Sequence, residues 1–187
     1  MRKLSVQEII EKVNLNDIPL MECILQNTQL DFMGENLGIL HMDGKDISVE
    51  ITSSRVTENV SRISAISEVR IKLVEYQRNM ASGRNVVLEG RDIGTVVFPN
   101  ADYKFYLIAD IQVRTQRRKK EMEAAGEHKS FEEVLLFLRN RDLQDSSRQH
   151  APLMKAEDAI ELDTTELSID EQVNYIINIV NQNQKGA

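Results

Sequence analysis

Hydrophobic and polar positions follow two different periods in the first third of the chain. Residues 5–8 (Ser-Val-Gln-Glu) form a capping-box pattern that predicts a short helix, and Pro19 with the irregular pattern after it is expected to end that helix. From residue 29 to residue 51 the apolar positions fall into short, strand-like runs separated by turn residues. The pair Asp43-Gly44 between two of these runs predicts a hairpin, because glycine adopts positive φ at little cost. The pattern therefore predicts a small antiparallel meander.

Helical spacing returns between residues 53 and 81, with an expected break near Ile66 and Ser67. The apolar positions of the second half of this segment fall on one face, which carries Ile66, Val69, Leu73 and Tyr76. We therefore expect helices that bury this face.

Short apolar runs alternate with helical segments in the second half of the chain. Buried strands are predicted at residues 85–89, 103–108 and 159–163. One helix is predicted from about residue 111, and two more follow the capping boxes at residues 130–133 and 168–171. Strands that alternate with helices form a parallel sheet with helices on its faces. The predicted fold class is therefore α/β, with the meander as an insert outside the parallel sheet.

The composition limits the function more than the fold. The length of 187 residues indicates one domain, or one domain that carries a smaller insert, and the 41% hydrophobic and 28% charged residues are a balance typical of globular proteins. No run approaches the roughly 18 apolar residues that span a membrane, and the first residues lack the apolar stretch of a signal peptide. We therefore expect a soluble, cytoplasmic protein. The net charge of −7 argues against nucleic-acid and membrane partners, since both require a basic surface.

Cysteine and histidine offer little chemistry. Cys23 is the only cysteine, and His41, His128 and His150 lie far apart without the spacing of metal ligands. No Ser-His-Asp pattern is evident and Cys23 has no neighbouring histidine, so nucleophilic catalysis is unsupported.

A charged pair flanked by glycines follows the predicted strand at residues 85–89. In Gly90-Arg91-Asp92-Ile93-Gly94 the glycines permit a tight turn, and open α/β sheets bind ligands at the carboxyl ends of their strands. The planar fork of an arginine at this place suits a phosphate. A surface salt bridge at a strand–loop corner explains the pattern equally well, so both interpretations stay open.

Two further arginine groups occupy single helix faces. Arg114, Arg117 and Arg118 are spaced to emerge from adjacent turns, where they either close over a polyphosphate or form a solvated face neutralised by Glu121 and Glu123. On a second helix Arg141, Asp145 and Arg148 are spaced i, i+4 and i+7. They either bind hydroxyl and phosphate groups or form a ladder of helix salt bridges.

Three motifs in order resemble the bacterial cytidylate kinase family. They are GRDIGTVVFP at residues 90–99, RDLQDSSRQHAP at residues 141–152 and DTTELSI at residues 163–169. The resemblance implies a nucleoside monophosphate kinase fold with a parallel-sheet core, a lid and a nucleotide-binding insert. Within a single domain over residues 1–187, it places the insert at residues 25–82, the core at 83–187 and the lid at about 111–150.

The resemblance also implies a reaction and the residues that perform it. In this family ATP, with Mg²⁺, phosphorylates CMP or dCMP to CDP or dCDP. By motif, Ser61 and Arg70 recognise cytosine from the insert, and Asp92 lies near the base. Arg91 binds the CMP phosphate, and the pentose and phosphate are contacted by Arg141, Asp145 and Arg148. The lid over ATP contains Arg114, Arg117 and Arg118. The catalytic residues implied are Arg91, Arg148, Arg117 and Arg118, with small-molecule nucleotides as the partners of a monomer.

One family feature is not found in these residues. Members begin with a strand, a G-x-x-x-x-G-K-[ST] phosphate loop and a helix, whereas the only Gly-Lys pair here is Gly44-Lys45, followed by Asp46. The first β-loop-α unit is therefore expected to be missing from the fold. The sequence is then an incomplete version of a longer enzyme, a short paralogue that binds pyrimidine nucleotides without catalysis, or a chain whose partner supplies the loop.

Overall fold

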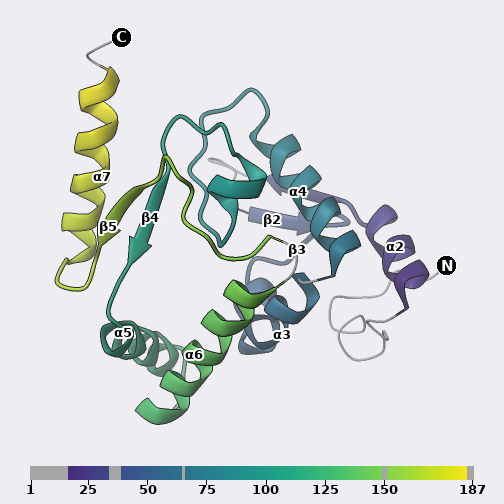
Figure 1. Cartoon of the computed structure of the whole chain (residues 1–187). Coiled ribbons are helices and arrows are strands. Elements are labelled where there is room, and N and C mark those ends of the chain that lie inside the picture. Colours follow the sequence, from purple (N-terminus) through teal and green to yellow (C-terminus); the bar gives the residue numbers. More distant parts are fainter. Residues whose placement is uncertain (1–16, 34–38, 65, 149–150, 185–187) are drawn as a thin grey trace. The chain divides into compact units, whose positions relative to one another are not determined.

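A computed structural model describes residues 17–33, 39–64, 66–148 and 151–184 (Figure 1). The capping box expected at residues 5–8 lies outside this range. The chain divides into two compact units, one within residues 1–90 and 148–152, the other within residues 91–147 and 153–187. No helix in the described ranges is long and apolar enough to cross a membrane.

The first unit contains the predicted antiparallel meander. Strands β1 (Leu30–Met33), β2 (Ile39–Met42) and β3 (Lys45–Asp46) form a sheet in the order β1-β2-β3. Asp43 and Gly44 between β2 and β3 both have positive φ, 53° and 82°. This is the geometry of the two-residue hairpin turn that an Asp-Gly pair favours, so the predicted hairpin is confirmed.

The third strand is shorter than the apolar pattern predicted. It ends at Asp46, and the single helical turn η2 (Glu50–Thr52) follows soon after it. The carboxylate of Asp46 accepts the backbone N–H of Ser48 at 2.8 Å, and Ile51 N–H donates to the carbonyl of Ile47 at 3.0 Å. These local bonds turn the chain away from β2, which is why the alternation of apolar residues does not continue as a strand.

Three helices complete the described part of this unit: α2 (Ile18–Gln26), α3 (Ser54–Ser64) and α4 (Ser67–Ala81). The predicted break near Ile66 is confirmed, since this residue has extended backbone angles between α3 and α4. The predicted apolar face is confirmed for Ile66, Val69 and Leu73, which belong to a core with the buried Met21 and with Leu20, Ile24, Leu25 and Ile63.

The position of α2 corrects the prediction that Pro19 ends a helix. Pro19 lies in the first turn of α2, where a missing backbone N–H costs nothing and the fixed φ suits the helix. The carboxylate of Asp17 caps this turn by accepting the N–H of Leu20 at 3.1 Å. Proline therefore starts this helix.

The second unit contains the parallel strands β4 (Phe105–Ile108) and β5 (Ile160–Asp163), with Phe105 opposite Ile160. Helices α5 (Ile111–Ala124) and α6 (Phe131–Ser147) connect them, and α7 (Ile169–Gln184) follows β5 and lies alongside both strands (Figure 1). This arrangement confirms the predicted α/β class. A second core lies between α5 and α6 and consists of Met122, Val134 and Leu138, packed by Ile111 and Phe137.

The strand predicted at residues 85–89 is not present. This segment has neither helical nor strand hydrogen bonding, Val86 is half exposed and Val87 is fully exposed. An apolar run becomes a strand only where a neighbouring strand pairs with it, and in the described part of the chain β4 pairs with β5 alone.

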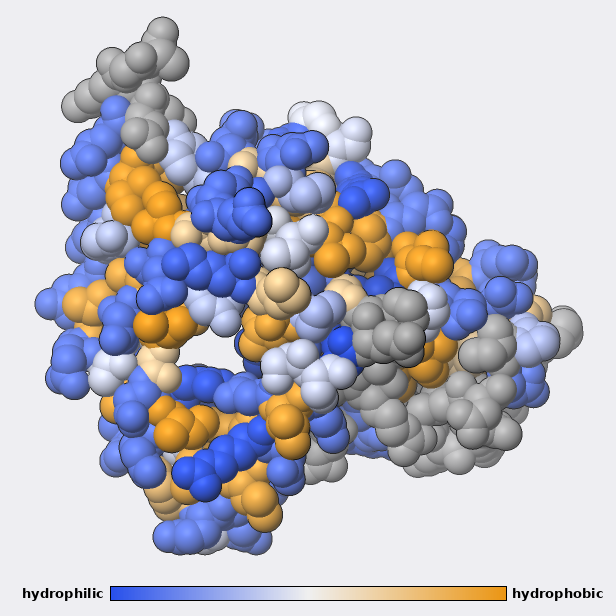
Figure 2. Space-filling view, viewed as in Figure 1, coloured by the Kyte–Doolittle hydropathy of each residue, from blue (hydrophilic) through white to orange (hydrophobic). Residues whose placement is uncertain are grey.

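Hydrophobic side chains are also exposed on α7 (Figure 2), among them Ile169, Val173 and Ile177.

Both capping boxes predicted in this unit are formed. At the start of α6, Ser130 N–H donates to the carboxylate of Glu133 at 2.7 Å, and Glu133 N–H donates to the Ser130 hydroxyl at 3.2 Å. At the start of α7, Ser168 N–H donates to Glu171 at 2.8 Å and Glu171 N–H donates to Ser168 Oγ at 3.3 Å. The two boxes satisfy backbone donors that helix starts otherwise leave unpaired.

We expect the capping box of α7 to make stability depend on pH. Hydrogen bonds from the Ser168 side chain and backbone lower the pKa of Glu171 below its ordinary value of 4.5. A lowered folded-state pKa stabilises the fold fully above the unfolded pKa, and this contribution disappears as pH falls through the folded pKa. Urea unfolding should show Glu171→Gln less stable than wild type at pH 7, with a smaller difference at about pH 3. Equal differences at both pH values, or a similar loss in the exposed Glu166→Gln control, would contradict this.

Candidate functional site

The turn that carries Arg91 and Asp92 is held by its own backbone. It continues into a single π-helical turn, η3 (Ile93–Val97). The carbonyl of Asp92 accepts the N–H groups of Thr95, Val96 and Val97 at 3.3, 2.9 and 3.2 Å. The Asp92 residue is only 3% exposed, and Arg91 beside it is half-buried. The backbone geometry of this turn therefore fixes the positions from which the Arg91 and Asp92 side chains project.

A buried carboxylate accepts the Arg91 side chain. Arg91 Nε donates to Asp145 Oδ2 at 2.9 Å, and Arg141 Nε lies 3.9 Å from the same oxygen. The Asp145 side chain is 4% exposed, whereas those of Arg91 and Arg141 are 39% and 27% exposed. The structure thus brings together a predicted turn residue and two predicted α6 residues, with the carboxylate between two arginines.

This cluster has more positive than negative charge. Burial, followed by the proximity of Arg91, lowers the pKa of Arg141 from its ordinary value. Two guanidinium groups that share one carboxylate retain one uncompensated positive charge, which an added anion would offset. Because both arginines keep solvent access, a phosphate can reach them and accept paired hydrogen bonds. The cluster is therefore suited to bind a phosphate group.

Arg148, the third predicted residue of this helix face, follows the last residue of α6 and belongs to the first unit. Its Nε and Nη2 atoms are buried and have no hydrogen-bond partner among the described residues. Buried donors without partners cost free energy, so such a guanidinium favours an external acceptor. An anionic ligand would supply that acceptor.

The three arginines of α5 have different partners. Arg114 donates through Nη1 and Nη2 to the two oxygens of Asp142 on α6, at 2.7 and 2.9 Å, and this hydrogen-bonded carboxylate raises the pKa of Arg114. Arg118 Nη1 lies 3.0 Å from Glu121 one turn further along α5, in an exposed pair. Glu121 thus pairs with Arg118 on the same helix, while Arg114 joins the two helices.

Arg117 points to the loop between β5 and α7. Its Nη2 donates to the carbonyls of Thr164, Thr165 and Leu167 at 2.6, 3.3 and 3.2 Å, and its Nη1 to the Thr164 hydroxyl at 3.3 Å. Thr164 is itself bound to Ile108 of β4 through N–H and hydroxyl. The arginine therefore ties α5 to the carboxyl ends of both parallel strands.

The two residues expected on the base lie in the first unit. Ser61 is in α3, and Arg70, half-buried, is in the first turn of α4, so the helix break at Ile66 separates them. The described residues contain no group of three or more His, Cys, Asp or Glu side chains placed to hold a metal ion.

The sequence did not reveal two ion pairs between separate elements, that of Asp142 in this site and that of Lys104 outside it. Asp142 is 28 positions from Arg114, and Lys104 is 54 positions from its partner Asp158. No sequence periodicity connects residues on separate elements at such distances. A charged residue directly after Arg141 was the only available signal for Asp142.

Comparison with known proteins identifies related chains over almost the whole length. The family model described as cytidylate kinase matches residues 1–182. A cytidylate kinase of Fusobacterium nucleatum is 40% identical over 175 residues, which cover 94% of this chain and 79% of the relative. One from Caldanaerobacter subterraneus is 38% identical over 99% of this chain and 81% of the relative, and one from Lactobacillus johnsonii is 42% identical over 87% and 71%.

Proposed function

The chain belongs to the cytidylate kinase family, and we propose that it binds CMP or dCMP as the acceptor for the γ-phosphoryl group of ATP, giving CDP or dCDP. The observation that carries this proposal is the carboxylate Asp145 between Arg91 and Arg141, a half-buried cationic cluster suited to one phosphate. It combines residues from two of the three motifs. The protein is on this proposal a nucleoside monophosphate kinase, a transferase of pyrimidine nucleotide metabolism.

The proposed reaction requires alignment and charge neutralisation but no protein nucleophile. A phosphate oxygen of CMP attacks the γ-phosphorus, a new P–O bond forms, and the bond between γ-phosphorus and the bridging oxygen breaks as ADP leaves. Arg91, Arg141 and Arg148 would hold the acceptor phosphate, with Asp145 also accepting from the pentose. Fixing two anionic groups in line supplies much of the rate acceleration in such reactions.

The donor nucleotide would be covered from the lid, which we place at about residues 111–150. Arg114 and Arg118 would exchange their carboxylate partners for ATP phosphates, while Arg117 anchors α5 to the loop between β5 and α7. Mg²⁺ would enter as the complex with ATP, where it neutralises charge on the β- and γ-phosphates. Ser61, Arg70 and Asp92 would recognise cytosine from the proposed insert at residues 25–82 and from η3.

A second candidate is a chain that binds pyrimidine nucleotides without phosphoryl transfer of its own. The observation that favours it is that the 187 residues contain no G-x-x-x-x-G-K-[ST] sequence to hold the ATP β-phosphate. A coupled assay of ADP formation with ATP, Mg²⁺ and CMP, together with calorimetric titration of CMP, separates the two.

We expect CMP to bind, and ADP formation to report whether this chain transfers the phosphoryl group. Turnover that Arg148→Ala reduces by about tenfold or more would support the kinase. CMP binding without turnover would support the second candidate. Absence of CMP binding, or CMP binding and turnover that Arg148→Ala both leave unchanged, would overturn the acceptor site.

A further inference from the structure

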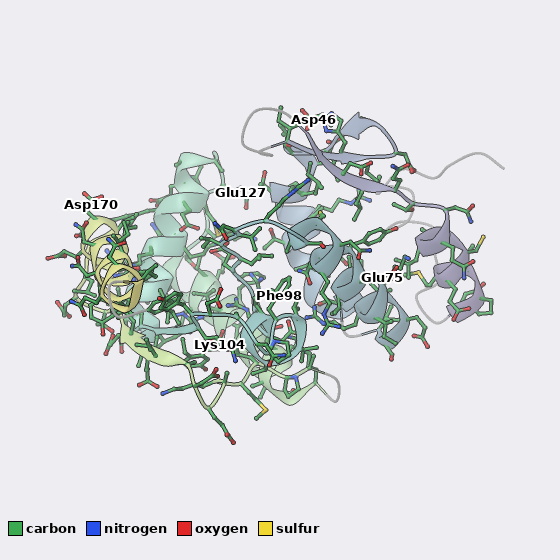
Figure 3. All side chains as sticks on the ribbon, turned by 90° about the horizontal axis from the view of Figure 1, so that it is seen from above. Asp46, Glu75, Phe98, Lys104, Glu127 and Asp170 are labelled. Carbon is green, nitrogen blue, oxygen red and sulfur yellow. The ribbon has the colours of Figure 1, made fainter. Side chains whose placement is uncertain are left out.

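Lys104, the residue before β4, is a buried lysine outside the site described so far. Its side chain is 7% exposed and lies beside the segment that contains Phe98 (Figure 3). The ammonium group donates to the carbonyl of Pro99 at 2.5 Å and to the two carboxylate oxygens of Asp158 at 2.8 and 2.7 Å. An ammonium has three donors, so these contacts use its full capacity.

The stem of the same side chain packs against the turn that carries Arg91. A Cβ atom added at Gly94 would lie 3.3 Å from Lys104 Cδ and 3.5 Å from Lys104 Cγ. A side chain at Gly94 would therefore require the lysine stem to shift by a few tenths of an ångström. Lys104 contacts the η3 turn at Gly94 and the chain just beyond it at Pro99, so one side chain spans the turn.

The backbone of Lys104 joins the turn to the sheet. Its carbonyl accepts the N–H of Ile160 at 2.9 Å, at the start of β5. Asp158, two residues earlier, is the carboxylate that the ammonium binds, and this hydrogen bond lowers the pKa of Asp158. The turn, the start of β4 and the start of β5 thus meet at one side chain.

The ion pair also contributes to folding, because the Lys104 side chain is buried, and the 65% exposure of the Asp158 side chain reduces that contribution. What the contacts do fix is the distance between the η3 turn and the sheet. Asp92 and Arg91 begin that turn, so a displaced η3 would move the Arg91 guanidinium away from Asp145.

We propose that Lys104 is a positioning residue for the acceptor phosphate, holding the turn of residues 90–97 so that Arg91 keeps its place on Asp145. This inference rests on the proposed function of Arg91. It predicts that loss of the Lys104 ammonium weakens binding of the phosphate more than binding of the nucleoside, because only one of the proposed base-recognising residues, Asp92, belongs to this turn, whereas Ser61 and Arg70 lie on α3 and α4.

The test compares CMP with cytidine, which lacks the phosphate, on the variant Lys104→Met. We expect the Kd of CMP to rise about tenfold and that of cytidine to change by less than about twofold. Lys155→Met is the matched control, since this lysine forms an exposed ion pair with Glu161 at 3.0 Å and should leave both Kd values unchanged. Asp158→Asn should change CMP affinity in the same direction as Lys104→Met and by less.

Gly94→Ala provides a second variant, which keeps the ammonium but displaces the aliphatic part of the Lys104 side chain. It should also weaken binding of CMP more than binding of cytidine. Equal losses for CMP and cytidine in both variants, or no loss in either, would overturn the proposal. Arg91→Ala separates this failure from failure of the proposed function. If Arg91→Ala weakens CMP while the Lys104 and Gly94 variants do not, only the role of Lys104 is wrong.

Discussion

Asp145→Ala is expected to lower the free energy of unfolding by about 2–3 kcal/mol. The carboxylate is 4% exposed and compensates both Arg91 and Arg141. Its removal leaves two neighbouring guanidinium groups without a counter-charge; a fully buried pair broken in this way costs about 3–5 kcal/mol, and the partial exposure of the arginines reduces that figure. Urea denaturation of wild type and variant at low ionic strength measures the difference.

Asp142→Ala is the matched control for this change. Asp142 lies on the same helix and binds Arg114 through both oxygens, but both side chains are 32% exposed, so we expect a loss of about 1 kcal/mol or less. The double variant Arg91→Ala/Asp145→Ala should lose less stability than the sum of its single variants, because removing one arginine relieves the repulsion. A loss below about 1 kcal/mol in Asp145→Ala would show that the arginine pair does not depend on this carboxylate.

Local sequence signals predicted most of the fold correctly. The Asp43-Gly44 hairpin, the break at Ile66 and the capping boxes at Ser130 and Ser168 depend on residues within four positions of one another. Such features form from neighbouring backbone groups whatever the remainder of the chain does. The parallel pairing of β4 and β5 followed from the alternation of strands and helices.

Features that depend on distant partners were predicted less well. Val86 and Val87 have the composition of a buried strand, yet no pairing strand is found among the described residues, and the segment stays irregular and exposed. The bond from Arg91 to Asp145 joins residues 54 positions apart. Spacing on one helix predicted the Arg141–Asp145 approach, but only the resemblance placed Arg91 at the same ligand. Sequence periodicity reports faces of single elements and contains no information on which faces meet.

Arg91→Ala is expected to raise the Kd of CMP by about 10- to 100-fold, which corresponds to loss of a charge-assisted phosphate contact. Arg91 Nε is held by Asp145, so the terminal nitrogens of the guanidinium remain available for paired bonds to a phosphate. Arg91→Lys keeps the charge but loses the fork, and its Kd should lie between those of wild type and Arg91→Ala. Isothermal titration of CMP measures all three values.

Arg84→Ala is the control for nonspecific charge effects, since Arg84 is exposed and lies seven positions before Arg91. A general loss of positive charge weakens attraction of any anion, and added salt screens that effect. The contact at Arg91 should instead persist in moderate salt, because a half-buried hydrogen bond is screened much less. Equal Kd values for Arg84→Ala and Arg91→Ala would mean that the cluster attracts anions only through its net charge, and that the acceptor phosphate binds elsewhere.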